Sequence, residues 1–160
     1  MTQTPSFPLL EHPAFRGLSD ASASSLERGC NVLRFELGGQ LCDPNDIAAR
    51  ILVILQGQAR LVGRHNGRLT TVGKFGPGSV IGAASLLCGA PCENVIAAEE
   101  VIACAISDEL WRKMYSDEDS FRQWCDQQLW PQELLKLLEV LEQNNPEADS
   151  SPLEKLKNAL

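Results

Sequence analysis

The hydrophobic positions of this chain change their period near residue 107. Before it, short apolar or alternating stretches end at glycines: NVLRFEL (31–37), RILVILQGQARLVGR (50–64), RLTTVGKF (68–75) and EVIACAIS (100–107). Such stretches, rich in Val, Ile and Leu and bounded by turn residues, predict β-strands. We expect about eight strands over residues 31–107, in a mainly β fold of the double-stranded β-helix or jelly-roll class with flanking helices.

Glycine-rich turns separate the expected strands. Asn66-Gly67 predicts a tight hairpin between 50–64 and 68–75, because both residues tolerate the positive φ angles of such turns. Gly38-Gly39 predicts a turn after the first strand, and GPG (76–78) ends the hairpin's second strand.

Helical periodicity takes over after Ser107. A short helix is also expected over residues 19–30, capped by Ser19 or Asp20. Ser107 caps the helix SDELWRKMYS, SFRQWCDQQLW (120–130) continues as helix, and Pro131 starts another. In that last helix the leucines line one stripe, Leu134, Leu137, Leu138 and Leu141, widened by Leu135 and Val140.

These patterns divide the chain into four parts. We expect an N-terminal helical segment (1–30), a β-roll (31–107), C-terminal helices (108–144), and a linker with the start of a further helix (145–160). That final helix has barely begun when the sequence stops, so we expect it to continue in a longer protein. The leucine stripe needs a cover, and we expect a homodimer through residues 131–144 or docking on neighbouring domains.

Composition and charge narrow the class of partner. No apolar run approaches the roughly 20 residues of a membrane span, and the N-terminus lacks the pattern of a signal peptide, so we expect a soluble cytoplasmic domain. The net charge is −7, and residues 108–160 hold 12 Asp/Glu against 6 Lys/Arg. Without a cluster of Lys and Arg, nucleic acid is not an expected partner.

Cysteine and histidine spacing gives no metal site. The six cysteines (Cys30, Cys42, Cys88, Cys92, Cys104 and Cys125) follow no CxxC spacing, and the two histidines lie far apart. We expect no metal and no cofactor. Buried, reduced thiols are the favoured state of the cysteines, with disulfides as the alternative.

One stretch carries a family resemblance. The run ILQGQARLVGRHNGRLTTVGKFGPGSVIG resembles the core of cyclic-nucleotide-binding domains, the fold of the catabolite activator protein. Gly57, Gly67 and the turn PGxxxG, formed by Pro77, Gly78 and Gly82, match that pattern. The resemblance covers roughly residues 10–145 and implies a phosphate-binding cassette over residues 76–97.

The cassette keeps its backbone pattern but lacks the family's ligand-holding side chains. Gly82 would allow close approach of a ligand. The amides of Ala83, Ala84 and Ser85 start a short helix whose N-terminus favours an anion. Members that bind cyclic AMP add a Glu for the ribose hydroxyl and an Arg for the phosphate. Those two positions are Ala83 and Cys92 here, and an acid, Glu93, follows.

These losses argue against ordinary cyclic AMP binding. Each lost charge-assisted hydrogen bond costs about 1.5–3 kcal/mol, so two losses remove about two to four decades of affinity. Glu93 adds repulsion toward a phosphate. The remaining candidate cations on the hairpin are Arg60, Arg64, Arg68 and Lys74. We expect them to be solvated, and the six residues Gly82, Ala83, Ala84, Ser85, Cys92 and Glu93 to form a degenerate ligand pocket.

A narrower resemblance suggests a context. LQGQARLVG and GAPCENVIA are similar to the N-terminal domains of cyanobacterial ABC transporters that export toxin or bacteriocin peptides. That resemblance implies a non-catalytic regulatory or docking domain of an inner-membrane transporter, with the transporter's other domains and an unidentified small ligand as partners.

Two other classes of function compete with this one. A free-standing cyclic-nucleotide-responsive regulator with a non-standard ligand is the alternative, although the acidic C-terminus and the missing helix-turn-helix count against it. A metal enzyme on a similar jelly roll needs converging histidines, but His12 precedes the roll and His65 lies at a hairpin tip. We therefore expect no enzymatic activity.

Overall fold

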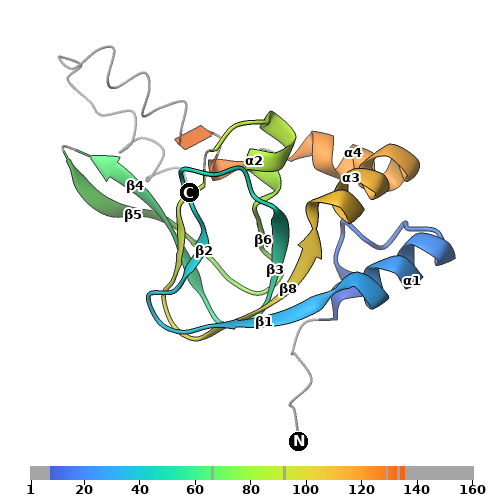
Figure 1. Ribbon diagram of the computed structural model, residues 1–160, viewed down its shortest axis with the longest axis horizontal. Coiled ribbons are helices and arrows are strands. Elements are labelled where there is room, and N and C mark those ends of the chain that lie inside the picture. Colours follow the sequence, from blue (N-terminus) through green and yellow to red (C-terminus); the bar gives the residue numbers. More distant parts are fainter. Residues whose placement is uncertain (1–7, 66, 92, 129, 133, 136–160) are drawn as a thin grey trace, which may run out of the picture.

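The computed structural model describes residues 8–65, 67–91, 93–128, 130–132 and 134–135 of the 160-residue chain. Within them, strands form two four-stranded antiparallel sheets, in the orders β1-β8-β3-β6 and β2-β7-β4-β5. The strands are β1 (Asn31–Phe35), β2 (Gln40–Cys42), β3 (Arg50–Gln56), β4 (Ala59–His65), β5 (Arg68–Phe75), β6 (Val80–Ile81), β7 (Val95–Ala97) and β8 (Val101–Ser107). The sheets curve around a common interior (Figure 1), which confirms the predicted jelly roll.

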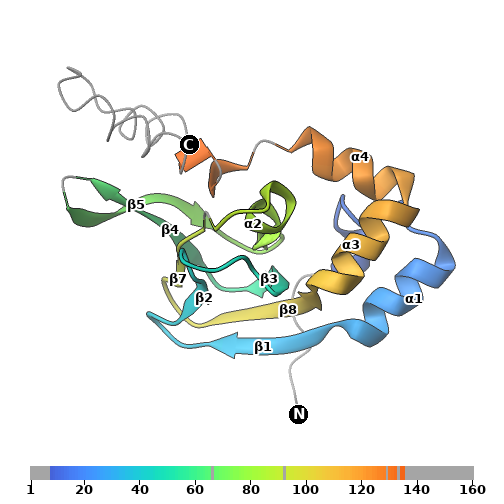
Figure 2. The same cartoon turned by 45° about the horizontal axis from the view of Figure 1, so that its top comes forward.

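Helices α1, α3 and α4 gather at one end of the roll, and α2 lies over the opening near β6 (Figures 1 and 2). The helical elements are η1 (Leu9–Glu11), α1 (Asp20–Gly29), α2 (Ala83–Cys88), α3 (Asp108–Asp117) and α4 (Asp119–Gln127). Ser19 caps α1 by accepting from the Ser22 amide, so the serine is the cap and Asp20 is the first helical residue. Each helix in the described part of the chain is too short or too polar to cross a membrane.

The predicted hairpin forms, but the long strand before it is broken. β4 and β5 pair through Arg64↔Leu69 and His65↔Arg68, on either side of the turn at 66–67. The expected strand over 50–64 divides at Gly57, whose φ is +89° and which packs against the backbone carbonyl of Glu100. A side chain would fit neither that φ nor that space. The chain passes from one sheet to the other at this glycine.

Hydrophobic residues form two separate clusters. The inner cluster fills the roll and contains mainly small and aliphatic side chains: Leu41, Cys42, Leu52, Ile54, Ala59, Leu61, Val72, Ile81, Val95, Ala97, Val101, Ala103, Ala105 and Leu135. Leu135, which widens the predicted leucine stripe, is 2% exposed and is therefore covered by the roll itself. Leu134 packs beside it. The rest of the stripe, with most of the proposed dimer segment 131–144, lies outside the described residues.

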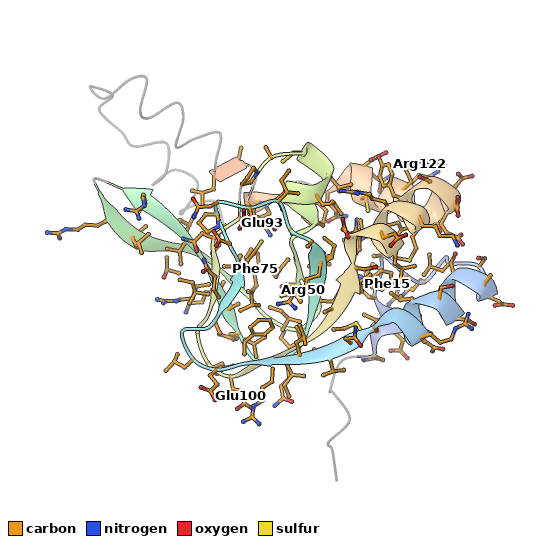
Figure 3. The ribbon with its side chains drawn as sticks, viewed as in Figure 1. Phe15, Arg50, Phe75, Glu93, Glu100 and Arg122 are labelled. Atoms are coloured by element: carbon orange, nitrogen blue, oxygen red, sulfur yellow. A yellow bond between two sulfur atoms is a disulfide. The ribbon has the colours of Figure 1, made fainter. Side chains whose placement is uncertain are left out.

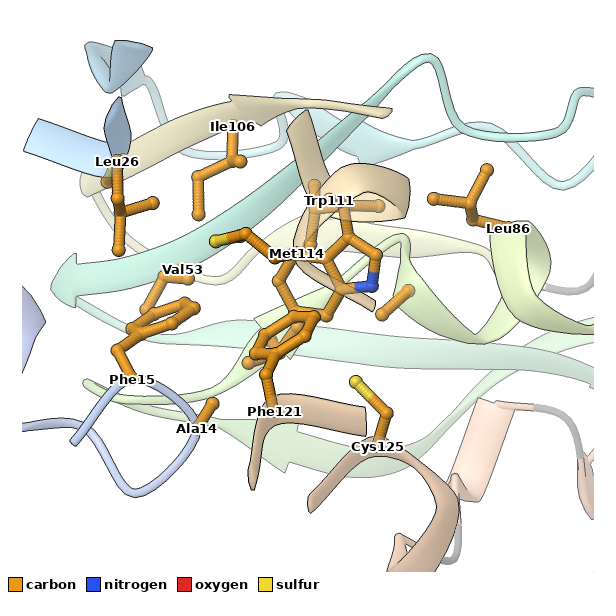
Figure 4. Packing of buried hydrophobic residues seen from close by; sticks show 14 of the residues in the cluster. Ala14, Phe15, Leu26, Val53, Leu86, Ile106, Trp111, Met114, Phe121 and Cys125 are labelled. Atoms are coloured by element: carbon orange, nitrogen blue, oxygen red, sulfur yellow. The ribbon is translucent and has the colours of Figure 1, made fainter. Parts of the chain in front are cut away.

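The outer cluster lies between the sheet that contains β3 and β8 and the helices (Figure 4). It is aromatic: Trp111 and Phe121 meet edge to face at 4.8 Å, and Phe15 stacks on Phe121 at 5.9 Å. The rest of the buried set comprises Ala14, Leu26, Ile51, Val53, Leu55, Val80, Ala83, Leu86, Cys104, Ile106, Met114 and Cys125.

Two cysteines correct the expectation of reduced thiols. Cys30, directly after α1, and Cys104 in β8 form a disulfide with a Cα–Cα distance of 5.7 Å. Sequence spacing does not reveal this pair, because β1 and β8 become neighbours only in the folded sheet. Cys42 and Cys125 are free and buried, and burial raises the pKa of each thiol to about 12.

Candidate functional site

Gly82 positions the start of the cassette. Its φ is +100°, in the left-handed region, and it precedes the first residue of α2. A Cβ at Gly82 would lie 2.9 Å from the carbonyl oxygen of Arg50 in β3. The close approach that requires glycine is therefore made to the protein's own strand. It holds the N-terminus of α2 against the roll.

Glu93 occupies the anion position of this cassette. The backbone N–H of Gly82 donates to Oε1 at 2.8 Å, and the N–H of Ser85 donates to Oε2 at 3.2 Å. The side chain lies beside α2 (Figure 3) and is 0% exposed. Two amides that would face a phosphate in a ligand-binding cassette thus hold a carboxylate of the same chain. We expect Glu93 to repel a phosphate; in the structure, its carboxyl group accepts the hydrogen bonds of the two amides itself.

Side chains from three elements complete the environment of Glu93. The Cys42 thiol of β2 lies 3.9 Å from Oε2, and the Ser85 and Gln132 side chains also hydrogen-bond to the carboxyl group. Burial raises the pKa of the Glu93 carboxyl group, and the hydrogen bonds from Gly82 and Ser85 act in the opposite direction. The group is buried without a cation but with several donors.

The remaining predicted site residues that the structure describes, Ala83, Ala84 and Ser85, are buried parts of the fold. Ala83 and Ala84 are buried, and Ala83 belongs to the outer cluster, so its side chain points away from the roll's interior. The Ser85 hydroxyl donates to the Gly82 carbonyl at 3.1 Å and accepts from the Ala48 amide at 3.3 Å. Cys92 lies outside the described residues. Whether any of these residues binds a ligand stays a prediction.

The hairpin cations remain at the surface. Arg60, Arg64, Arg68 and Lys74 are all exposed. Arg60 donates to Thr71 across the hairpin at 3.5 Å. Their position supports the expectation that they are solvated. Among the described residues, no cluster of three or more His, Cys, Asp or Glu side chains has the arrangement of a metal site.

Two site residues were missed by the sequence analysis. Cys42 and Gln132 both contact Glu93, although 39 or more positions separate each of them from it. The sequence contains one hint for Glu93 itself. Residues 47–92 contain no Asp or Glu, so Glu93 is the first acid after a long stretch without one. It follows a glycine turn whose backbone amides can donate to it. Nothing in the sequence marks Gln132.

Three solved structures illustrate the fold that this chain shares. The regulatory subunit of a cAMP-independent protein kinase A from Trypanosoma brucei, as a mutant bound to cAMP in the A site, matches with TM-score 0.58 and 22% identity over 74% of this chain and 48% of that chain. The catabolite activator protein of Thermus thermophilus matches with TM-score 0.59 and 20% identity over 86% and 60%. A putative cyclic nucleotide-binding protein from Geobacter metallireducens matches with TM-score 0.62 and 20% identity over 74% and 86%.

Identities this low show a shared fold, and the chain spans about half the length of the trypanosomal subunit. No curated protein matches the chain. The model of the cyclic nucleotide-binding domain family, however, matches residues 32–118, which include both sheets and the whole cassette. Since that match covers more than half of the chain, this protein belongs to the cyclic nucleotide-binding domain family.

Proposed function

We propose that this chain is a non-catalytic regulatory or docking module whose phosphate cassette is filled by its own Glu93. The observation that carries the proposal is the pair of amide hydrogen bonds from Gly82 and Ser85 to the two carboxylate oxygens. A cyclic phosphate would have to displace this carboxylate and then find no arginine at position 92. The module therefore does not respond to cyclic AMP or cyclic GMP.

The C-terminal segment supports a closed pocket. Gln132 is 1% exposed and hydrogen-bonds to Glu93, while Leu135 enters the inner cluster. One short segment thus covers both the cassette and the interior of the roll. A module closed in this way presents a fixed surface to neighbouring domains, as a docking domain requires.

We place this module at the N-terminus of an ABC transporter that exports a toxin or bacteriocin peptide. The support is the resemblance of LQGQARLVG and GAPCENVIA to such domains, together with Glu93, the residue that fills the cassette. In this context Glu93 is a structural residue of the docking domain, and the transporter's other domains are its partners.

The test is to empty the cassette and restore its cation. Calorimetry with cyclic AMP and cyclic GMP should detect no binding by the wild type at micromolar ligand. Cys92→Arg combined with Glu93→Ala should gain affinity, because the amides of Gly82 and Ser85 become available to a phosphate. The Trypanosoma brucei subunit is described as cAMP-independent, and a mutant of it is bound to cAMP, so reprogramming of this kind has a precedent in the fold.

Two controls sharpen this experiment. Cys92→Arg alone should gain little, since Glu93 still fills the amides. Ala83→Glu should be combined last, because Ala83 is fully buried in the outer cluster and a charged side chain there risks the fold. Micromolar binding by the wild type would overturn the proposal. A folded double variant that gains nothing would show that the roll is closed by more than Glu93.

A free-standing regulator with a non-standard ligand is the second candidate. The observation that favours it is a cavity of about 390 Å³ beside β5, lined by Leu61, Val72, Gly73, Lys74, Phe75 and Pro131. Lys74 gives this cavity a cation that the cassette lacks. The reading frame of the complete gene separates the two candidates, because a transporter adds membrane-spanning and ATPase segments.

A further inference from the structure

A second cavity lies behind the cassette, outside the roll. Its volume is about 190 Å³, and its walls come from α4, from the turn after β5 and from residues 130–132. None of Gly82, Ser85 and Glu93 lines it. The cavity is therefore separate from the phosphate position and stays available when Glu93 fills the cassette.

Three aromatic rings contribute to the walls of this cavity. Trp124 and Trp130 meet edge to face with ring centroids 5.8 Å apart, and Phe75 contributes a third ring. His12 holds Trp124 in position. The centroids of the two rings lie 5.5 Å apart, and His12 Nε2 donates to the Gly78 carbonyl at 2.7 Å. The rings are held in place by the fold, so a ligand meets a preformed aromatic corner.

The polar groups of the cavity are mainly acceptors. Gln128 uses its side-chain amide nitrogen to donate to the Trp124 carbonyl at 3.0 Å. Gln132 is buried, and its Oε1 has no hydrogen-bond partner among the described residues. A buried acceptor of this kind is stabilised by any ligand that supplies a donor. Among the residues that the structure describes, the lining includes no Lys, Arg, Asp or Glu.

An electron-rich cavity without charged side chains selects for positive ligands. The faces of Trp and Phe rings attract cations, most strongly where water is partly excluded. An anion finds no cation among the described lining residues, and the net charge of −7 favours cations at long range. We propose that this cavity binds a small organic cation of the methylated-ammonium class, with its charge on Trp124 and Trp130 and a hydroxyl or N–H group donating to Gln132 Oε1.

This site goes beyond the proposed function, because it gives the module a ligand of its own. Gln132 contacts Glu93 on one side and lines the cavity on the other. A cation in the cavity would therefore be felt at the cassette through one side chain. The two proposals can fail separately, since the cyclic nucleotide titrations are run without an organic cation.

Choline and its uncharged isostere 3,3-dimethylbutan-1-ol are the probes. They share shape and hydroxyl group and differ in charge, so the comparison isolates the cation–ring attraction. Tryptophan fluorescence and saturation-transfer NMR should show saturable choline binding, about tenfold tighter than that of the alcohol. Equal affinities, or no saturable choline signal, would overturn the proposal.

Variants of Trp130 connect that signal to the cavity. Trp130→Leu should lose about tenfold in choline affinity, whereas Trp130→Phe, which keeps a ring face, should lose less. Leu37→Ala, at a side chain 74% exposed and remote from the cavity, is the matched control and should bind like the wild type. Unchanged binding by Trp130→Leu would contradict the site, and the phenylalanine variant keeps the test usable if the leucine variant does not fold.

The cation could be a free metabolite or a lipid headgroup, and a second arm separates these sources. Phosphatidylcholine vesicles that sediment with the protein, and release it when choline is added, would assign the headgroup. Vesicles that do not bind a protein which still binds choline would assign the free cation.

Discussion

The outer and inner clusters stabilise the same fold by different means. The outer cluster is built from large rings, with Phe15, Trp111 and Phe121 in mutual contact. The inner cluster contains alanines, valines and leucines between two sheets, and Cys42 connects it to a buried carboxyl group. Aromatic rings hold the helices on the sheet. The small side chains of the inner cluster leave one end of the roll to be covered by Glu93, Gln132 and Leu135.

Beside each cluster, one buried side chain hydrogen-bonds to the backbone of the cassette: His12 beside the outer cluster and Glu93 beside the inner cluster. When ionised, the two groups carry opposite charges. Burial lowers the pKa of His12, which packs on Phe15 and Trp124 beside the outer cluster. Burial raises the pKa of the Glu93 carboxyl group at the mouth of the inner cluster. His12 accepts from Ala14 and contacts Gly78, at the start of the cassette, while Glu93 contacts Gly82 and Ser85. The cassette is thus held from both sides by groups that burial drives toward their neutral forms.

The largest expected effect is in the outer cluster. Trp111 is 0% exposed, and Trp111→Ala should lower the free energy of unfolding by about 3–5 kcal/mol, since a ring is replaced by a cavity. Urea unfolding at pH 7.5 measures this loss.

A matched variant separates ring packing from polarity. The Trp111 Nε1–H is buried and has no partner among the described residues. Trp111→Phe removes that donor and keeps most of the packing, so it should cost much less than the alanine variant. Equal losses in the two variants would show that the indole nitrogen has a partner that the contacts do not show.

The second effect is at the mouth of the inner cluster. Glu93→Ala leaves two buried amides, of Gly82 and Ser85, without an acceptor and should cost about 2–4 kcal/mol. Because the pKa of Glu93 is raised in the fold, its contribution to the free energy of unfolding is complete below pH 4.5, the ordinary pKa of a glutamate. That contribution is lost as pH rises through the folded pKa. The gap between variant and wild type should therefore be larger at pH 4.5 than at pH 7.5.

An acidic surface residue gives the control for that prediction. Glu99 is exposed and follows β7, so Glu99→Ala should stay close to the wild type at both pH values. A Glu93→Ala variant as stable as Glu99→Ala would contradict the role of Glu93 in the cassette.

Sequence patterns predicted the architecture because they report local physics. The change of period at Ser107, the predicted Asn66-Gly67 turn and the serine caps each depend on a few neighbouring residues. In the structure, strands give way to helices at Ser107, Ser19 and Ser107 cap helices, and β4 pairs with β5 across the predicted turn. Gly57 was recognised as part of the family pattern, but its role in dividing one predicted strand depends on the carbonyl of Glu100, 43 positions later. Contacts of that kind are set by the sheet pairing.

The sequence predicts where the candidate site lies, but it does not predict that the Glu93 side chain accepts hydrogen bonds from the amides there. The absence of the family's glutamate and arginine predicts a degenerate cassette, and Glu93 is predicted to be unfavourable for a phosphate; both stay predictions. Its occupation of the amides depends on a backbone path that returns residue 93 to Gly82, and on Cys42 and Gln132 from distant elements. The buried Leu135 and the Cys30–Cys104 disulfide were missed for the same reason.

The smallest expected effect comes from His12. Its ring accepts from the Ala14 amide through Nδ1 at 3.0 Å, which requires the neutral form. Since the folded pKa lies below the ordinary 6.5, the stability from this group is complete above pH 6.5 and is lost as pH falls toward the folded pKa. The slope is at most about 1.4 kcal/mol per pH unit. His12→Gln should flatten the stability profile between pH 6.5 and 5, measured by urea unfolding.

The opposite pH dependence of Glu93 would mask this slope, so the measurement belongs in a Glu93→Ala background. His65, the other histidine of the chain, is removed as His65→Gln in both proteins, so that the difference reports His12 alone. The charged group that faces His12 is Arg16, which also lowers the pKa of His12. Arg16→Gln should therefore raise the folded pKa of His12, so that less stability is lost at pH 5. A slope that survives His12→Gln would assign the acid sensitivity to groups other than His12 and would contradict the role given to His12.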